Sequence, residues 1–358
     1  MRIRSVWAGL VMLGLLVAGC TAPSGGSGQG QGASALDRVK SRGELVCGIN
    51  DQVPGFGLRQ PDGTYAGFDI DYCKVIAAAV LGDASKVVYK PLVPDQRFPA
   101  LQSGEVDVLS RNTTWTAQRD GGQGAAFVAT TFYDGQTMMV RADSPYQAIE
   151  DMRDTAICVL TGTTTELNLA TRFAASGIGY NPVPFQDVPT LQQAFEQQRC
   201  DGWSSDRSQL AGIRSRWPQE RGGPQALRIL DETFSKEPLG PAVRDGDQRW
   251  FDAVNWAVIA TIQAEEFGID SANVEQMRQS ANPDILRFLG QPVSSEQGGA
   301  AAVFDPRLGL PADFAVAVLS QVGNYREIYD RNIGPLGVPR ELNALWKDGG
   351  LHYAPPYR

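Results

Sequence analysis

Histidine is almost absent from this sequence of 358 residues, in which His352 is the single example. A zinc site built on a histidine cluster needs more than one such residue, and a Ser-His-Asp triad needs a histidine placed among its partners. The composition therefore argues against both. We expect no metal ion, no cofactor and no catalytic residue in this chain.

Basic residues are fewer than acidic ones. The chain has 32 lysines and arginines against 40 aspartates and glutamates, a formal net charge of −8. A protein that binds nucleic acid or anionic lipid through its surface normally has the opposite balance. We therefore expect no nucleic-acid partner. The length is sufficient for two domains of common size.

A long apolar run is missing except at the N-terminus. Arg2 and Arg4 precede a run of roughly fifteen residues that ends at Gly19, too short to span a bilayer comfortably and typical of a secretory signal. The sequence LVAGC then follows the pattern of a bacterial lipobox, in which Cys20 becomes the lipidated first residue. An ordinary signal peptide with a coincidental cysteine is the alternative. We expect a signal peptide over 1–19 and a lipidated, flexible Gly- and Ser-rich linker over 20–35.

The remaining cysteines are even in number and contain no CxxC motif. They are Cys47, Cys73, Cys158 and Cys200. In an exported protein this pattern predicts two disulfides, with three possible pairings. We favour Cys47 with Cys73 and Cys158 with Cys200, because each pair would lie within one of two predicted lobes. Four buried free thiols are the alternative.

Strand-like and helix-like segments alternate along the first part of the chain. The predicted strands are 43–49, 87–92 and 105–109, and the predicted helices are 36–42, 67–82 and 97–103. This alternation predicts a mostly parallel sheet with helices on its faces, and ligands bind such sheets outside the carboxyl ends of the strands.

A second cycle of the same kind follows. Its strands are predicted at 137–141, 155–160, 181–185 and 200–204, with helices at 163–176 and 188–198. Residues 227–243 then form a return crossing, and helices follow at 250–266, 272–290 and 312–332. Two α/β units joined by two crossings place a cleft between them.

Three polar stretches fall where such a cleft would be lined. Residues 110–119 follow a predicted strand and end in Arg119, a residue type that holds carboxylates bidentately. Thr163 and Glu166 form a capping-box pattern, and the first-turn amides of that helix form an anion site. Asp206 follows the strand at 200–204 and complements an ammonium group. Each stretch has a structural alternative: a solvated loop for the first, a purely structural helix start for the second and a helix N-cap for the third. Together, however, the three stretches predict a binding site for one zwitterionic ligand.

The chain resembles bacterial extracellular solute-binding proteins of the polar amino acid type, and among them the longer general L-amino-acid-binding proteins of ABC transporters. The similar segments are 67–73, 101–108, 112–119, 162–169, 200–206, 342–347 and 353–358. Tyr72 departs from this pattern, because an aliphatic residue or phenylalanine is expected there.

The resemblance implies a role for individual residues. Arg119 would hold the ligand carboxylate, assisted by the amide of Thr164 beside Thr163. Thr114 would bond the ligand backbone. Asp206 and the carbonyl of Asn112 would take the ammonium group.

The predicted pocket for the side chain of the ligand differs from that of narrow-specificity relatives. Val53 and Pro94 stand where such relatives place stacking aromatic residues. Phe56, Trp115 and Trp203 are the candidates to replace them. A missing aromatic platform would suit tolerance of many side chains.

We therefore expect a periplasmic-binding-protein-like α/β fold, with lobe 1 over 36–137 and 237–358, lobe 2 over 138–236, and the ligand cleft between them. The expected function is capture of L-amino acids, of broad or polar specificity, by a lipid-anchored monomer that delivers them to an ABC permease. The alternative is an enzyme on the same fold, similar to cyclohexadienyl dehydratase, which would use Asp206 or another carboxylate as general acid or base. A receptor for signalling is a third, weaker hypothesis.

Overall fold

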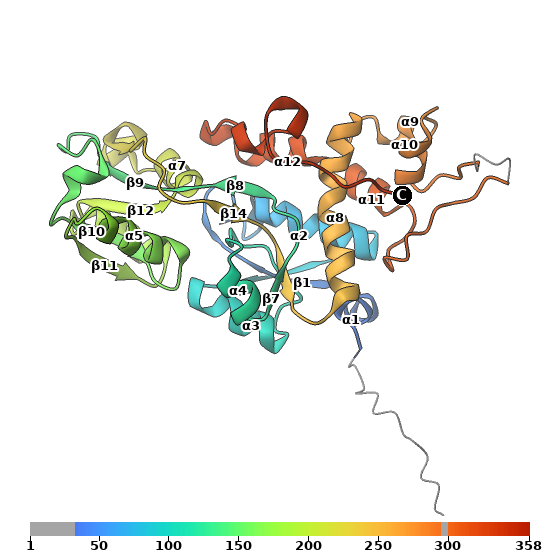
Figure 1. Ribbon diagram of the computed structural model, residues 1–358, viewed down its shortest axis with the longest axis horizontal. Helices are drawn as coiled ribbons and strands as arrows, with labels where there is room; N and C mark the ends of the chain where they lie inside the picture. The colour runs from blue at the N-terminus through green and yellow to red at the C-terminus, as the bar shows by residue number, and fades with distance from the viewer. Residues whose placement is uncertain (1–32, 295–299) are drawn as a thin grey trace, which may run out of the picture. The chain divides into compact units, whose positions relative to one another are not determined.

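The computed structural model describes residues 33–294 and 300–358, which build two separate five-stranded sheets (Figure 1). The predicted signal peptide, Cys20 and nearly all of the predicted linker lie outside the described residues. No helix in the described part is long and apolar enough to cross a membrane.

The sheet of lobe 1 has the strand order β5-β1-β6-β15-β7. Its strands are β1 (Leu45–Ile49), β5 (Val87–Pro91), β6 (Val108–Leu109), β7 (Ala125–Phe127) and β15 (Ala242–Arg244). β1 pairs in parallel with β5 and β6, as the alternation predicts. β15 runs antiparallel to β6 and β7, because the chain enters it from the return crossing.

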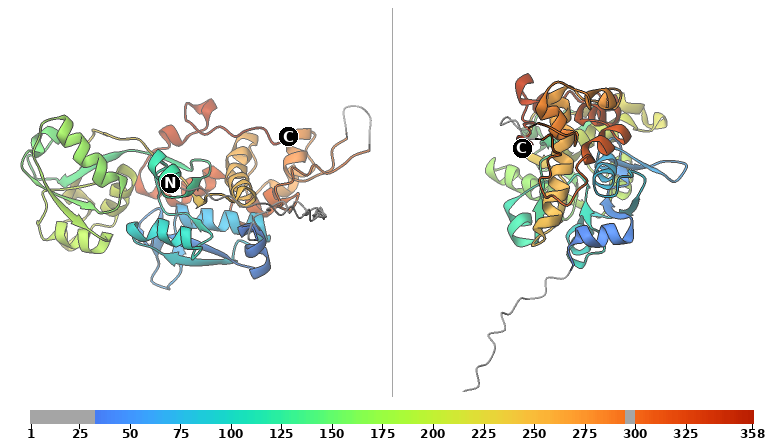
Figure 2. Two further views of the ribbon diagram at one scale, coloured as in Figure 1. Left: turned by 60° about the horizontal axis from the view of Figure 1, so that its bottom comes forward. Right: turned by 90° about the vertical axis from the view of Figure 1, so that its right-hand side faces the viewer.

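Helices of lobe 1 cover this sheet (Figure 2). They are α1 (Ala35–Arg42), α2 (Phe68–Leu81), α3 (Arg97–Ser103), α4 (Ala117–Gly122) and α8 (Gln248–Phe267). α2 is buried along almost its whole length, because it contacts β1 on one side and α8 and α11 (Phe314–Gln321) on the other. That position explains why the helix is apolar on every face after Lys74.

A small antiparallel sheet precedes α2 and has no counterpart among the predicted elements. It consists of β2 (Gln52–Val53), β3 (Gly57–Arg59) and β4 (Tyr65–Ala66). Gly67 joins it to α2 with φ +143°, and a Cβ there would lie 2.1 Å from the carbonyl oxygen of Phe56. Only glycine fits this position.

The sheet of lobe 2 has the strand order β11-β10-β12-β9-β13. Its strands are β9 (Gln136–Arg141), β10 (Ala156–Leu160), β11 (Asn181–Phe185), β12 (Gly202–Asp206) and β13 (Leu227–Ile229), and its helices are α5 (Thr164–Ala175), α6 (Val188–Glu196) and α7 (Arg207–Ser215). β10 is parallel to β11 and β12, and β9 is antiparallel to β12 and β13. The sequence predicts every one of these helices except α7.

Two antiparallel strands connect the lobes (Figure 1). β8 (Phe132–Asp134) carries the chain toward lobe 2 and β14 (Glu237–Leu239) returns it, with Asp134 opposite Glu237 in the register. Two α/β lobes joined by two crossing strands confirm the predicted fold class.

The C-terminal region contains shorter helices than the sequence suggests. The single helix predicted at 272–290 is wrong, because α9 (Val274–Met277) ends before a separate α10 (Pro283–Phe288). The helix predicted at 312–332 is likewise two helices, α11 (Phe314–Gln321) and α12 (Tyr325–Asn332). Pro283 cannot continue a helix, and Gly323 has φ +100°, outside the helical region.

Short 3-10 turns complete the chain. They are η1 (Pro94–Gln96), η2 (Ile149–Met152), η3 (Gln219–Arg221), η4 (Gly223–Ala226), η5 (Gly334–Leu336), η6 (Glu341–Asn343) and η7 (Trp346–Asp348). Asn343 of η6 lies against the crossing: its side-chain amide donates to the carbonyl of Tyr133 at 3.0 Å and accepts from the Tyr133 N–H at 2.7 Å. The C-terminal segment therefore binds the open edge of β8.

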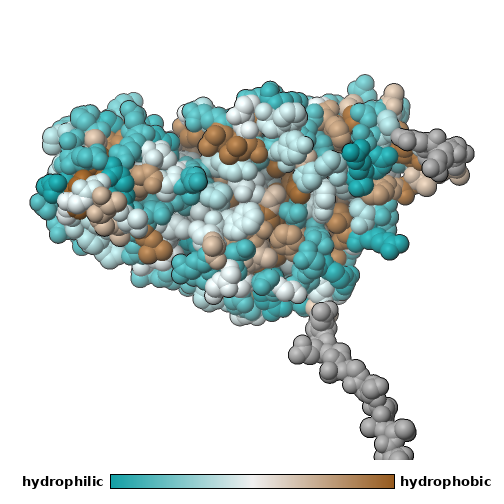
Figure 3. Space-filling model, in the orientation of Figure 1, coloured by the Kyte–Doolittle hydropathy of each residue, from teal (hydrophilic) through white to brown (hydrophobic). Residues whose placement is uncertain are grey.

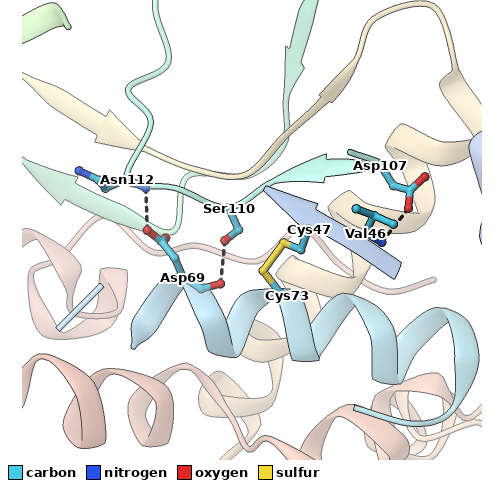
Figure 4. Close-up of a disulfide and its surroundings, with 7 residues drawn as sticks. All are labelled: Val46, Cys47, Asp69, Cys73, Asp107, Ser110 and Asn112. Carbon is cyan, nitrogen blue, oxygen red and sulfur yellow. Dashed lines mark hydrogen bonds between the residues drawn. A yellow bond between two sulfur atoms is a disulfide. The ribbon is translucent and has the colours of Figure 1, made fainter. Parts of the chain in front are cut away.

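Both favoured disulfides are present. Cys47 of β1 is bonded to Cys73 of α2 (Figure 4), and Cys158 of β10 is bonded to Cys200 just before β12. Each disulfide lies within one lobe, which confirms the pairing that the predicted lobes favour. The alternative of four free thiols is wrong.

Exposed apolar side chains are few and scattered. Hydrophilic residues predominate on the face shown in Figure 3. The large exposed apolar residues at the C-terminal end are Leu342, Trp346, Leu351 and Tyr353. The rings of Trp346 and Tyr353 contact each other edge to face.

Candidate functional site

The polar loop after β6 is held by the first turn of α2. The hydroxyl of Ser110 donates to the carbonyl of Asp69 at 2.9 Å, and the amide of Asn112 donates to the Asp69 carboxylate at 2.6 Å (Figure 4). Asn112 has φ +30°, unusual for a residue with a side chain, and the bond to Asp69 compensates for this strain. Burial raises the pKa of Asp69 to about 7, although the Asn112 amide and Arg111 oppose that shift.

Arg119 lies one helical turn beyond this loop. The sequence does not predict the short helix α4, which Thr116 caps and within which Arg119 lies. Its side chain is buried, and Nη1 donates to the carbonyl of Thr114 at 2.8 Å. Desolvation lowers the pKa of Arg119, while Glu237 and Asp206 act in the opposite direction.

No ion pair in the described part of the chain involves Arg119. A buried guanidinium without a carboxylate partner is costly, and a ligand carboxylate would remove that cost. Arg119 is therefore suited to bind an anion.

The N-terminus of α5 comes from lobe 2. Thr163 caps it by accepting from the amide of Glu166 at 3.1 Å, as predicted. The second half of the predicted capping box is wrong, because the Glu166 carboxylate accepts from the amide of Gly162 instead of that of Thr163. The amides of Thr164 and Thr165 are first-turn donors with no acceptor inside the helix. This end of α5 can bind an anion.

The two lobes meet at these residues. The hydroxyls of Thr114 and Thr164 lie 3.2 Å apart across the cleft. Arg119, Thr114 and the first turn of α5 are therefore brought together, although they are far apart in the sequence. Asn112 also reaches lobe 2, where its side-chain amide donates to Gln209 at 3.3 Å.

Asp206 ends β12 and occupies the N-cap position of α7, but its side chain does not cap that helix. It is 5% exposed, and its Oδ1 is buried without a hydrogen-bond partner. Burial raises the pKa of Asp206 well above its ordinary value. Asp134 and Glu237 raise it further, while Arg119 and Arg97 oppose them.

Glu237 is an acidic residue of the site that the sequence does not reveal. Its carboxylate accepts hydrogen bonds from both lobes and from Ser235, two residues before it in the return crossing. The donors are Thr114 Oγ1 at 2.6 Å, Thr164 Oγ1 at 2.9 Å, Asn168 Nδ2 at 2.6 Å and Ser235 Oγ at 2.6 Å. No motif surrounds Glu237, so the only signal is a charged residue within a predicted crossing.

Asp134 lies opposite Glu237 on the other crossing strand. Its carboxylate accepts from the amide of Gly135 at 2.8 Å and from the amide and hydroxyl of Ser208. Burial raises the pKa of Asp134 to about 6. Asp134 and Glu237 thus have protein donors, whereas Asp206 has none among the described residues.

A cavity of about 480 Å³ opens beside Arg119 and the N-terminus of α5. Residues of both lobes line it, among them Pro94, Phe98, Arg119, Gly162 and Thr164. No group of three or more His, Cys, Asp or Glu side chains in the described ranges is arranged to hold a metal ion. The arrangement can bracket a small solute that carries one negative and one positive group.

Comparison with known families agrees with this geometry. Residues 45–268 match the bacterial extracellular solute-binding proteins, family 3. This chain belongs to that family.

Three similar proteins cover nearly the whole length of this solute-binding protein. The general L-amino acid-binding periplasmic protein AapJ of Rhizobium johnstonii is 48% identical over 91% of this chain and 93% of its own. The glutamate/glutamine/aspartate/asparagine-binding protein BztA of Rhodobacter capsulatus is 44% identical over 99% of each chain. A solved ABC transporter or periplasmic binding protein from Brucella ovis, with glutathione bound, is 44% identical over 91% of this chain and all of its own, with a TM-score of 0.85.

The three aromatic candidates of this solute-binding protein lie in different surroundings. Phe56 is buried in lobe 1, where its ring contacts those of Phe68 and Phe132 edge to face. Trp203 is buried in lobe 2 against Phe195. Trp115 is 42% exposed.

The ring of Trp115 stacks on Phe127 of lobe 1. None of the three candidates is among the residues that line the 480 Å³ cavity. Their role in a side-chain pocket therefore stays a prediction.

A second buried arginine of the solute-binding protein also faces the cleft. Arg97 begins α3 and is 2% exposed. Its Nε donates to the carbonyl of Pro94 at 2.9 Å, and its Nη2 donates across the cleft to the carbonyl of Gly162 at 3.0 Å. The sequence offers no motif that distinguishes it from the surface arginines.

Proposed function

We propose that this protein captures free L-amino acids in the cleft between its lobes and delivers them to the permease of an ABC importer. One observation carries the proposal. Within residues 33–294 and 300–358, Asp206 is a buried carboxylate without a donor, and it faces Arg119, a buried guanidinium without a carboxylate partner. An α-amino acid supplies the missing ammonium and carboxylate on the same carbon atom.

In this proposal each end of the ligand has contacts from both lobes. Arg119 and the first-turn amide of Thr164 hold the carboxylate. Asp206 and the carbonyl of Asn112 hold the ammonium group. Thr114 bonds the ligand backbone, and Thr163 supports the site by capping α5. The names of AapJ and BztA, both amino-acid-binding proteins, support this assignment.

We further propose that the lobes close on the ligand by a hinge in the crossing strands. Lobe 1 then comprises residues 36–137 and 237–358, and lobe 2 comprises 138–236. A ligand that contacts both lobes favours the closed arrangement by its differential affinity for the two states. The hydrogen bonds that Glu237 accepts from both lobes support a crossing that responds to closure.

The family is extracellular, so the protein is exported. We propose that Cys20 carries a lipid that anchors the chain to a membrane through the linker over 20–35, and that the protein works as a monomer beside its permease. We also propose that it is not an enzyme. The similarity to named binding proteins favours transport over the dehydratase alternative.

A ligand screen tests the proposal. Residues 33–358 form one compact unit, and their melting temperature is measured with each of the twenty L-amino acids and with prephenate. Amino acids should raise the melting temperature by mass action, and Arg119→Ala should remove that shift while the protein still folds. Unchanged calorimetric affinity of Arg119→Ala for its amino acids would overturn the site assignment. Turnover of prephenate would overturn the transport function.

A further inference from the structure

Arg97 is a second cation at the ligand cleft, and the protein gives it no counter-ion. Arg97 takes part in no ion pair within residues 33–294 and 300–358. Its two hydrogen bonds use Nε and Nη2, and both acceptors are neutral carbonyls. A buried guanidinium with only carbonyl partners is costly unless an anion completes its surroundings.

The charges that face Arg97 agree with an unfilled anion position. Burial lowers the pKa of Arg97 well below its ordinary value, and the nearby Arg111 and Arg119 lower it further. Asp206 and Asp95 act in the opposite direction, but neither forms an ion pair with Arg97. A second carboxylate from the ligand would relieve this repulsion among cations.

The position of Arg97 places it next to the bracket for the amino acid. The ring centroid of Phe98 lies 5.6 Å from the guanidinium carbon of Arg97 and 5.5 Å from that of Arg119, so both cations flank one ring. Pro94 and Gly162, whose carbonyls bond Arg97, line the same cavity as Arg119. Arg97 itself does not line the cavity, but both of its hydrogen-bond partners do, so its guanidinium lies next to the cavity that Arg119 lines.

The balance of charge then defines the ligand. Asp95 and Glu166 also line the cavity, but Asp95 is exposed to solvent and Glu166 accepts from the amide of Gly162. Asp134 and Glu237 likewise receive donors from the protein, which leaves Asp206 as the buried carboxylate, with the guanidinium groups of Arg97 and Arg119, for the ligand. Two carboxylates and one ammonium complement these three groups. L-aspartate and L-glutamate carry that set, with two or three carbon atoms between the carboxylates.

We infer that Arg97 determines specificity for the ligand side chain, selecting L-amino acids with a side-chain carboxylate first, a side-chain amide second, and aliphatic side chains last. This inference rests on the proposed amino-acid-binding function. Carboxylates lead because a charge-assisted bond to guanidinium is about twice as strong as a neutral one, and an amide oxygen accepts only neutral-type bonds. The competing role for Arg97 is a simple latch, in which its bond to Gly162 holds the lobes together for every ligand alike.

Calorimetric titration of residues 33–358 with L-glutamate, L-glutamine and L-alanine separates the two roles. In Arg97→Met, which keeps an apolar stem, the affinity for L-glutamate should fall about 100-fold, that for L-glutamine about 10-fold, and that for L-alanine less than about threefold. Arg97→Lys should recover part of the L-glutamate affinity, because it restores the charge without the planar fork.

Arg141→Met is the matched control. Like Arg97, Arg141 donates to a backbone carbonyl, that of Cys200, but it is partly exposed, pairs with Asp201 and lies in lobe 2 within β9. Arg141→Met should leave the affinities for L-glutamate, L-glutamine and L-alanine unchanged. The melting temperature of each variant checks that it is folded.

Different failures have different signatures. An equal loss for all three ligands in Arg97→Met would establish the latch and overturn the inference. Wild-type protein that binds L-alanine as tightly as L-glutamate would also overturn it, while leaving amino-acid binding intact. Wild-type protein that binds none of the twenty L-amino acids would overturn the proposed function itself.

Discussion

Glu237 offers the sharpest test of how ligand binding depends on contact between the lobes. It lies on the return crossing and accepts bonds from Thr114 in lobe 1 and from Thr164 and Asn168 in lobe 2. Two of these donors belong to lobe 2, at 2.9 and 2.6 Å. Removing the carboxylate therefore removes two bonds that need the lobes to be in contact.

The size of the effect follows from these two bonds. A hydrogen bond to a charged group contributes about 1.5 to 3 kcal/mol, and water can replace part of it. With the lower figure for each bond, Glu237→Ala should make the free energy of lobe closure less favourable by about 3 kcal/mol. The ligand Kd should then rise about 100-fold. Glu237→Gln keeps the shape and an acceptor oxygen but loses the charge, so it should cost about half as much, or about 10-fold.

The assay is calorimetric titration of wild type and both variants with one ligand from the screen. Glu232→Gln is the matched control, since Glu232 lies in the same connection but bonds Arg172 of lobe 2. Its affinity should stay within about twofold of wild type, because the pair is partly exposed. A Glu237→Ala protein that is folded and binds within threefold of wild type would refute the proposed link between Glu237 and closure.

Three further predictions concern pH, the crossing and the start of α2. The ionised form of Asp206 binds the ligand ammonium, and the pKa of Asp206 is raised. Affinity should therefore be highest above that raised value, while the ligand ammonium is still protonated, and should fall as the pH drops through it. Asp134→Asn removes a repelling charge and should move this fall to lower pH in pH-dependent titrations. Asn343→Ala leaves two backbone groups of Tyr133 without partners and should lower the free energy of unfolding by about 2 kcal/mol in urea denaturation. Gly67→Ala forces a Cβ against a backbone oxygen at φ +143° and should cost at least about 2 kcal/mol, measured in the same way.

Each of these predictions can fail in a recognisable way. A pH midpoint that Asp134→Asn leaves unmoved would show that its charge does not act on Asp206. An Asn343→Ala protein as stable as wild type would mean that water satisfies the edge of β8. A Gly67→Ala protein of unchanged stability would mean that the backbone relaxes at no cost.

Local patterns in the sequence predict the parts of the fold that depend on neighbouring residues. α3 and β11 have the predicted bounds, because apolar periodicity and turn residues mark them. The two long C-terminal helices are predicted wrongly, because Pro283 begins a new helix and Gly323 has φ +100°, outside the helical region. Helix breaks of this kind depend on single proline or glycine residues, and a pattern of apolar residues does not show where such a residue ends a helix.

The candidate site divides in the same way. Thr163 and Asp206 stand at helix N-cap positions directly after strands, and Arg119 ends a polar stretch that follows a strand, so a sequence pattern can single them out. Glu237, Asp134 and Arg97 have no motif around them.

The sequence by itself therefore determined the family resemblance and the two-lobe fold class, favoured the observed disulfide pairing among three, and proposed the residues that would bracket an amino acid. The tertiary structure alone decided that Glu237 bonds both lobes and that Arg97 and Arg119 share one ring. The physical reason is that the cost of burying a charge depends on which donors and counter-ions surround it, and those come from distant parts of the chain that only folding brings together.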